Sequence, residues 1–246
     1  KATMTSLIDQ FKVASSASQQ LNIVTEINET RNHIETMATL ASIRHSIDTR
    51  DEFYDAEQNY WDEYGPLYEE INSLFYDAVV SSPYRNELEE KLSKQFFTIL
   101  DYRLKAFSPE IIADLQEENK LSSQYTKLLA SAKIPFDGEE RTLPGMGKYL
   151  LSEDRTVREA ASKAKYAFFE EHEAEIDEIY DQLVKVRTRI AKKLGFNNFV
   201  ELGYVRMTRS DYNPEMVENF RKQVLDYIVP VATSLYNRQE ARLGYG

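Results

Sequence analysis

The sequence contains no cysteine, and it has only eight glycines and seven prolines among its 246 residues. Without cysteine the chain forms no disulfide and cannot use a thiol as a nucleophile, which is compatible with a cytoplasmic protein. Glycine and proline interrupt helices, so their scarcity favours long uninterrupted helices. The hydrophobic content of 42% is nevertheless that of a globular protein with a core of its own.

Basic clusters and long apolar runs are also missing. The net charge is −11, from 41 acidic and 30 basic residues, and no basic block interrupts this acidic balance. Such a composition argues against a nucleic-acid partner. No apolar run reaches the length of a membrane span, and no signal peptide is recognisable. We therefore expect a cytoplasmic protein that binds neither nucleic acid nor membrane.

Helical periodicity fills the first half of the sequence. Apolar residues recur at spacings of three and four over four successive stretches, residues 5–49, 51–80, 84–106 and 108–130. The serine cluster at 15–18 predicts a break or a helix cap, and Gly65-Pro66 should bend the second stretch or mark a boundary. Ser108 and Pro109 suit the cap and the first position of the fourth helix.

The rhythm changes between residues 134 and 143. Asp137-Gly138 separates two short extended runs there, which predicts a β-hairpin. Residues 144–147 should follow as a loop. Helical periodicity then returns from 153 to 194, either as one very long helix or as two helices with a break near His172.

The last predicted helix begins at Asn213-Pro214, a capping residue followed by a first-turn proline. Pro230 lies inside this helix and should kink it near Asp226, whose carbonyl it cannot bond. Gly244 is a suitable stop. The expected fold is thus mainly α, with long antiparallel helices and one short β-hairpin near 134–143. We predict an N-terminal helical lobe over 1–133, a hairpin and loop over 134–150, and long helices over 151–246.

The most informative stretch runs from Asp177 to Tyr212. Its first half has one apolar face, and Gly195 follows as the expected residue with positive φ beyond the helix end. Arg187 lies on the apolar face, where a charge needs a partner. We favour a paired structural arginine; the alternative is an arginine that points into a cleft.

The same stretch carries a family resemblance. From Arg187 to Tyr212 the chain has the pattern R-x-x-I-A-x-x-L-G-F-x-N-F-x-E-L-G-Y-x-R-M-x-R-x-D-Y. The segments 149–158 and 220–230 carry the same family resemblance. This pattern resembles the oligoendopeptidase F branch of the thimet-oligopeptidase-like zinc peptidases. The resemblance implies the N-terminal portion of a peptidase that cleaves short peptides in a deep cleft between helical lobes.

The zinc motif of that family, H-E-x-x-H, is absent from the sequence. Only His172 precedes a glutamate, Glu173, and Ile176 stands at the position of the second ligand. His33 and His45 have no second ligand at helical spacing. We interpret 170–178 as an exposed acidic helix and expect this chain to bind no zinc and to hold no catalytic residue. The resemblance implies that the zinc ligands and the catalytic base lie beyond Gly246, in a C-terminal catalytic portion.

Four residues are candidates for contact with a substrate: Arg187, Arg206, Arg209 and Tyr212. The last three, together with Asp211, stand in what we predict to be a loop after the central stretch, and loops held by rigid helices often carry function. The alternative is that these residues cap helices and pair among themselves. The sequence offers no other catalytic motif, because Gly145 to Lys148 lacks P-loop spacing and no G-x-S-x-G is present.

Two functions fit these observations. The first is the N-terminal portion of a zinc metalloendopeptidase that supplies one wall of a cleft for short peptides and is inactive by itself. The second is a helical interaction or scaffold domain without chemistry of its own, because long amphipathic helices suit that role equally well.

Overall fold

Helices make up most of the chain in the computed structural model, which describes residues 1–244. The N-terminal half holds α1 (Ala2–Val13), α2 (Ala17–Ile47), α3 (Glu52–Val80), α4 (Arg85–Leu92), α5 (Lys94–Lys105), the 3-10 turn η1 (Pro109–Ile111) and α6 (Ile112–Ala130). The remainder holds β1 (Ile134–Phe136), β2 (Glu139–Arg141), the 3-10 turn η2 (Pro144–Met146), α7 (Gly147–Leu150), α8 (Arg155–Glu171), α9 (Glu173–Lys193), α10 (Phe199–Arg206), α11 (Pro214–Gln223), the π-helical turn η3 (Val224–Ile228) and α12 (Val229–Leu243).

Local capping residues set many of these ends. The Ser16 side chain accepts a hydrogen bond from the Gln19 N–H and begins α2, and Asn213 accepts one from the Met216 N–H and begins α11. Gly244 ends α12 in the left-handed conformation, with φ of 69°. The predicted break in the serine cluster, the start at Asn213-Pro214 and the stop at Gly244 are therefore confirmed.

The structure corrects two predicted segments and decides between the two alternatives for a third. The single helix expected over 84–106 is wrong, because Ser93 adopts φ of +81° and separates α4 from α5. Its hydroxyl accepts a hydrogen bond from the Phe96 N–H and so caps the second helix. The segment 153–194 is two helices that meet at His172, and the loop expected over 144–147 is coiled into η2 and the first turn of α7.

The predicted hairpin is confirmed. Strands β1 and β2 are antiparallel, with Pro135 opposite Glu140 and Phe136 opposite Glu139. Asp137 and Gly138 have φ of 53° and 74°, the combination that a two-residue turn of the I′ type requires. The hairpin and η2 lie against α8 and share a small core in which Ala161 and Met146 are fully buried.

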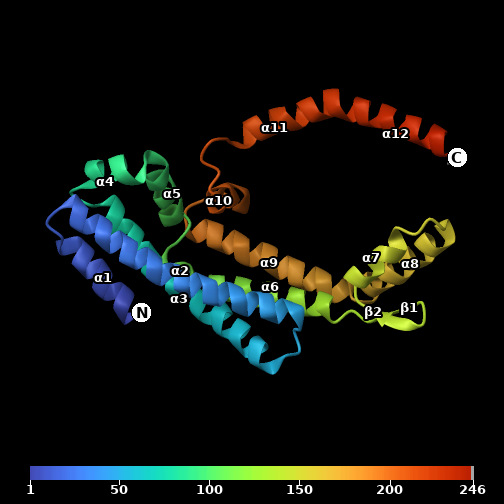
Figure 1. The fold of residues 1–246 in the computed structure, drawn as a ribbon, viewed down its shortest axis with the longest axis horizontal. Coiled ribbons are helices and arrows are strands. Elements are labelled where there is room, and N and C mark those ends of the chain that lie inside the picture. The colour runs from blue at the N-terminus through green and yellow to red at the C-terminus, as the bar shows by residue number, and fades with distance from the viewer. Residues whose placement is uncertain (245–246) are drawn as a thin grey trace.

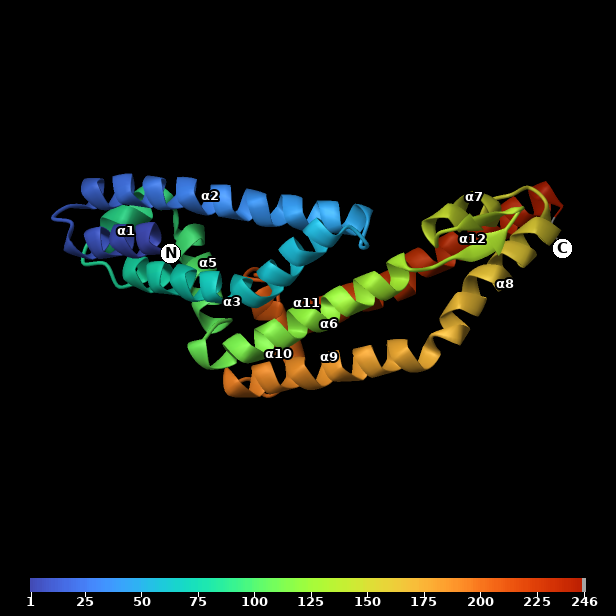
Figure 2. The same ribbon diagram turned by 90° about the horizontal axis from the view of Figure 1, so that it is seen from below.

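Helices α1 to α5 form one group, and the hairpin with α7 and α8 forms another. The antiparallel helices α6 and α9 join the two (Figures 1 and 2). One core lies among α1 to α5 and is built around Phe11, Phe75 and Phe97. A second core holds α6, α9 and α10 together through Ile111, Val186, Ile190 and Leu202. Figures 1 and 2 show α6 and α9 running side by side from the α1–α5 group toward the hairpin and α8. The boundaries proposed at 133/134 and 150/151 stay a prediction.

Two prolines shape the longer helices. Pro66 lies within α3, and Figure 2 shows that helix bending midway along its length, as Gly65-Pro66 predicted. The turn η3 comes just before Pro230, and Figure 1 shows α11 and α12 as a bent arc that extends away from the other helices. Among the described helices, none combines the length and the apolar character that crossing a bilayer demands.

Candidate functional site

The junction between α9 and α10 is built by local hydrogen bonds. Gly195 has φ of +82°, its N–H donates to the Lys192 carbonyl at 3.1 Å, and the Phe196 N–H donates to the Ala191 carbonyl at 2.9 Å. This pair of bonds is a Schellman motif and confirms the prediction for Gly195. The Asn198 side chain accepts from the Glu201 N–H at 3.2 Å and begins α10. The chain therefore folds back immediately after α9.

This reversal brings two of the predicted arginines to one carboxylate. Glu118 of α6 accepts from Arg187 Nε at 2.7 Å and from Arg206 Nη1 at 3.1 and 2.9 Å. Both guanidinium groups also lie over the Phe199 ring, 5.6 and 5.7 Å from its centroid. The partner expected for Arg187 is thus Glu118, which is only 9% exposed. Two cations share one carboxylate, and Arg206 Nη2 is buried without a hydrogen-bond partner among the described residues.

Further ion pairs continue this seam along α6 and α9. Asp114 accepts from Arg189 Nε and from Lys193 Nζ, each at 2.6 Å. Burial works against the charged form of Asp114, but the hydrogen bonds from Lys193 and Arg189 outweigh it and hold the pKa of Asp114 below its ordinary value. We name the set Asp114, Glu118, Arg187, Arg189, Lys193 and Arg206 the arginine seam. It links α9 and α10 to α6.

The other two predicted residues lie just beyond α10. Arg209 sits over the rings of Tyr204 and Tyr212, 4.5 and 5.5 Å from their centroids. The Tyr102 hydroxyl of α5 donates to the Arg209 carbonyl at 3.3 Å, which ties the segment to the N-terminal group. No carboxylate lies within ion-pair distance of the Arg209 guanidinium among residues 1–244.

The structure therefore divides the four candidates into two pairs. Arg206 was expected in a loop, but it is the last residue of α10. It pairs with Glu118 rather than with its neighbours in sequence, because the fold-back at Gly195 turns α10 toward α6. Arg209 and Tyr212 do lie outside the helices and are partly exposed. The structure thus joins Arg187 with Arg206, and Arg209 with Tyr212.

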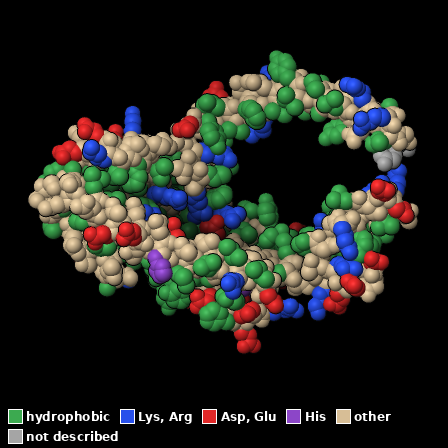
Figure 3. Space-filling view, in the orientation of Figure 1, with side chains coloured by type: hydrophobic (Ala, Val, Ile, Leu, Met, Phe, Trp, Pro, Cys, Tyr) green, Lys and Arg blue, Asp and Glu red, His purple; other side chains and the backbone are tan. Residues whose placement is uncertain are grey.

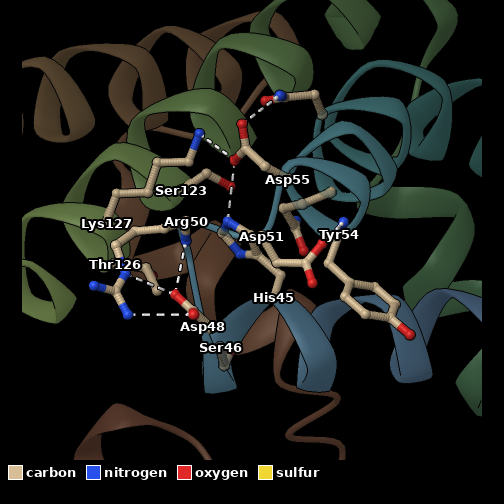
Figure 4. A network of polar contacts seen from close by, with 12 residues as sticks. His45, Ser46, Asp48, Arg50, Asp51, Tyr54, Asp55, Ser123, Thr126 and Lys127 are labelled. Atoms are coloured by element: carbon tan, nitrogen blue, oxygen red, sulfur yellow. Dashed lines mark hydrogen bonds and ion pairs between the residues drawn. The ribbon is translucent and has the colours of Figure 1, made fainter.

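Sequence reasoning missed a second polar cluster, where the end of α2 and the start of α3 meet α6. His45 is 2% exposed, and its Nε2 lies 3.2 Å from Asp55 Oδ1. Figure 4 shows Lys127 reaching the same carboxylate from α6, with its Nζ 2.5 Å from Asp55 Oδ1. The hydrogen bond from Lys127 lowers the pKa of Asp55. The turn between the helices places His45 beside Asp55, a pairing that helical spacing alone does not reveal.

The residues that the structure describes do not fit a zinc site. His172 Nδ1 lies 3.6 Å from Glu175, and Ile176 occupies the position of a second ligand. Over residues 1–244 no three histidine or acidic side chains come together as metal ligands, whereas a catalytic zinc needs three protein ligands. No catalytic step can therefore be built on a metal held by these residues.

Comparisons with known proteins find one family model and several solved structures that are similar to this chain. Residues 1–107 match the peptidase M3 N-terminal domain. A solved structure described as an oligoendopeptidase F from Bacillus anthracis str. Ames superposes with a TM-score of 0.95 at 53% identity, over 99% of this chain and 45% of that one. PZ peptidase A with an inhibitor superposes with a TM-score of 0.95 at 53% identity, over 99% of this chain and 43% of its own.

A third structure, also described as an oligoendopeptidase F, has a TM-score of 0.96 at 50% identity and covers 100% of this chain and 43% of its own. The chain thus spans less than half the length of these relatives. No curated protein matches it.

Proposed function

Because the chain belongs to the peptidase M3 family, as the N-terminal portion of an oligoendopeptidase F, we propose that it forms one wall of a cleft in which short peptides are hydrolysed. The observation that carries this proposal is the 53% identity over 99% of the chain. On this proposal the protein is a metallopeptidase whose zinc and catalytic base are held by a C-terminal catalytic portion. A sequence without cysteine is compatible with the reducing cytoplasm, and we propose that the protein is cytoplasmic.

The shape of the molecule supports the proposal that it forms one wall of a cleft. Figure 3 shows an opening bordered by the arc of α11 and α12 on one side and by α8 and α9 on the other. The arc buries none of its residues against the rest of the chain, and Phe220, Ile228 and Leu235 are each more than half exposed. Exposed apolar side chains gathered along one segment mark a surface that a partner covers. We propose that the partner is the C-terminal catalytic portion of the same protein.

The two pairs of candidate residues take different roles in this proposal. Arg187 and Arg206 are occupied by Glu118, so we assign them the task of positioning α10. Arg209 and Tyr212 are partly exposed and follow the C-terminal end of α10. A guanidinium stacked on tyrosine rings and free of carboxylates suits a peptide carboxylate or carbonyl. We propose that these two side chains contact the substrate.

The proposal is tested by one peptidase assay on two proteins, this chain and a longer one that continues it with the C-terminal portion. A set of quenched fluorescent peptides is offered to each, with and without a chelator. We expect the longer protein to cleave in a chelator-sensitive manner and this chain to cleave nothing. Chelator-sensitive cleavage by the shorter chain would overturn the location of the active site. No cleavage by the zinc-loaded longer protein would favour a scaffold.

Arg209 is tested in the longer protein by Arg209→Gln, with Arg155→Gln as the matched control. Arg155 is exposed at the start of α8, far along the chain from the proposed contact. We expect Arg209→Gln to raise KM for peptides about tenfold, the effect of losing one charge-assisted hydrogen bond of about 1.4 kcal/mol. Unchanged KM in Arg209→Gln, or an equal effect of Arg155→Gln, would remove Arg209 from the site.

A further inference from the structure

A cavity of about 140 Å³ lies between α2 and α3, beside the start of α1. Trp61 and Tyr68 form an aromatic side of it, with ring centroids 5.6 Å apart. Gly65 lies between them in sequence and leaves the cavity open, because a Cβ built on it would meet no atom within 4 Å. An apolar cavity of about 150 Å³ is large enough for a benzene ring. The cavity therefore has room for one aromatic side chain.

Two hydrogen-bond donors of the cavity lining have no partner. Trp61 Nε1 and Arg31 Nε are both buried and unpaired among the described residues. The other nitrogens of Arg31 are occupied, since Nη2 donates to the Tyr76 hydroxyl at 2.6 Å and Nη1 to Asn28 Oδ1 at 3.2 Å. Buried donors are normally satisfied. A ligand that brings a carbonyl oxygen into the cavity would supply the missing acceptor after a small side-chain adjustment.

The charged residues of the cavity favour a cation. Arg31, Glu35 and Glu69 line it, so the lining itself has one positive and two negative charges. Burial raises the pKa of Glu69, although Arg103 and Arg31 work against this. Arg31 Nη2 lies 3.5 Å from Glu35, while Glu69 has no ion-pair partner within 4.0 Å over residues 1–244. A positively charged amine beside Glu69 would offset the negative charge that Arg31 leaves uncompensated.

We propose that this cavity binds the amino-terminal residue of a short peptide when that residue is aromatic. The ring fills the apolar space against Trp61 and Tyr68, the ammonium group pairs with Glu69, and the backbone carbonyl accepts from Trp61 Nε1. The site lies between α2 and α3, whereas the proposed substrate contacts follow α10. It is therefore measured by binding alone and does not depend on hydrolysis.

The chain carries its own reporter for this test, because Trp61 is its single tryptophan. We expect phenylalanine amide, added to the full chain, to produce a saturable change in tryptophan emission, with heat of binding in calorimetry. N-acetyl-phenylalanine amide, which lacks the ammonium group, should bind at least about tenfold more weakly. Alanine amide should give no change. A folded chain that shows no response to phenylalanine amide would refute the site, and equal binding of the acetylated probe would refute the role of Glu69.

The variant Gly65→Leu tests whether phenylalanine amide binds inside the cavity. Leucine has the higher helix propensity, and its side chain enters the open space at Gly65, so the variant should fold and lose binding of phenylalanine amide by calorimetry. Gly147→Leu is the matched control, because a Cβ at Gly147 in α7 also meets nothing within 4 Å. Binding that survives Gly65→Leu would overturn the assignment. If circular dichroism shows that Gly65→Leu is unfolded, the Glu69→Gln variant tests the site instead. Undiminished affinity of Glu69→Gln for phenylalanine amide would overturn the proposal.

Discussion

Removal of the Glu118 carboxylate tests whether the arginine seam holds α10 in place. Glu118→Ala deletes charge-assisted hydrogen bonds to Arg187 and Arg206, at 2.7 and 2.9 Å. Bonds of this kind contribute about 1.5–3 kcal/mol each in a buried setting. The Arg187 side chain is 36% exposed and that of Arg206 is 24% exposed, so solvent screening reduces their sum. We expect the variant to lose about 2–4 kcal/mol of unfolding free energy.

The neighbouring residue supplies the control. Glu117 is 49% exposed, and its only ion pair within residues 1–244 is with Arg189. Arg189 keeps its second partner, Asp114, when Glu117 is removed. Glu117→Ala should therefore cost less than about 1 kcal/mol. Urea unfolding followed by circular dichroism measures both variants, and hydrogen exchange of the α10 amides reports the local effect. Equal losses in the two variants, with unchanged exchange in α10, would show that Glu118 is an ordinary surface acid.

Two further predictions concern local geometry and pH. Gly195→Val should lower the unfolding free energy by about 1 kcal/mol or more, because φ at this position is +82°; an unchanged melting temperature would contradict it. The lowered pKa of Asp114 means that its pairing stabilises the fold fully above the unfolded pKa of about 3.9 and is lost as the pH falls through the lower folded value. Asp114→Asn should therefore reduce stability at neutral pH and flatten the acid limb of a melting-temperature profile, and a parallel acid limb in this variant would refute the linkage.

The amino-acid sequence by itself determined the elements whose ends depend on neighbouring residues. Ser16, Asn213 and Gly195 each bond a backbone group three positions away, and Asp137-Gly138 needs only its own two positive φ values. Signals of this range are visible in a linear pattern. Composition and the long motif ending at Tyr212 were sufficient to identify the helical class and the peptidase family.

Only the tertiary structure decided which side chains meet. Arg187 finds its partner 69 residues away and Arg206 finds the same carboxylate 88 residues away, distances over which periodicity carries no information. The break at Ser93 depends on a left-handed backbone conformation that serine adopts only when the surrounding helices impose it. The cavity beside Trp61 likewise lies between side chains that α1, α2 and α3 bring together from distant parts of the sequence. Local chemistry sets where the helices begin and end, and packing between distant segments decides what they enclose.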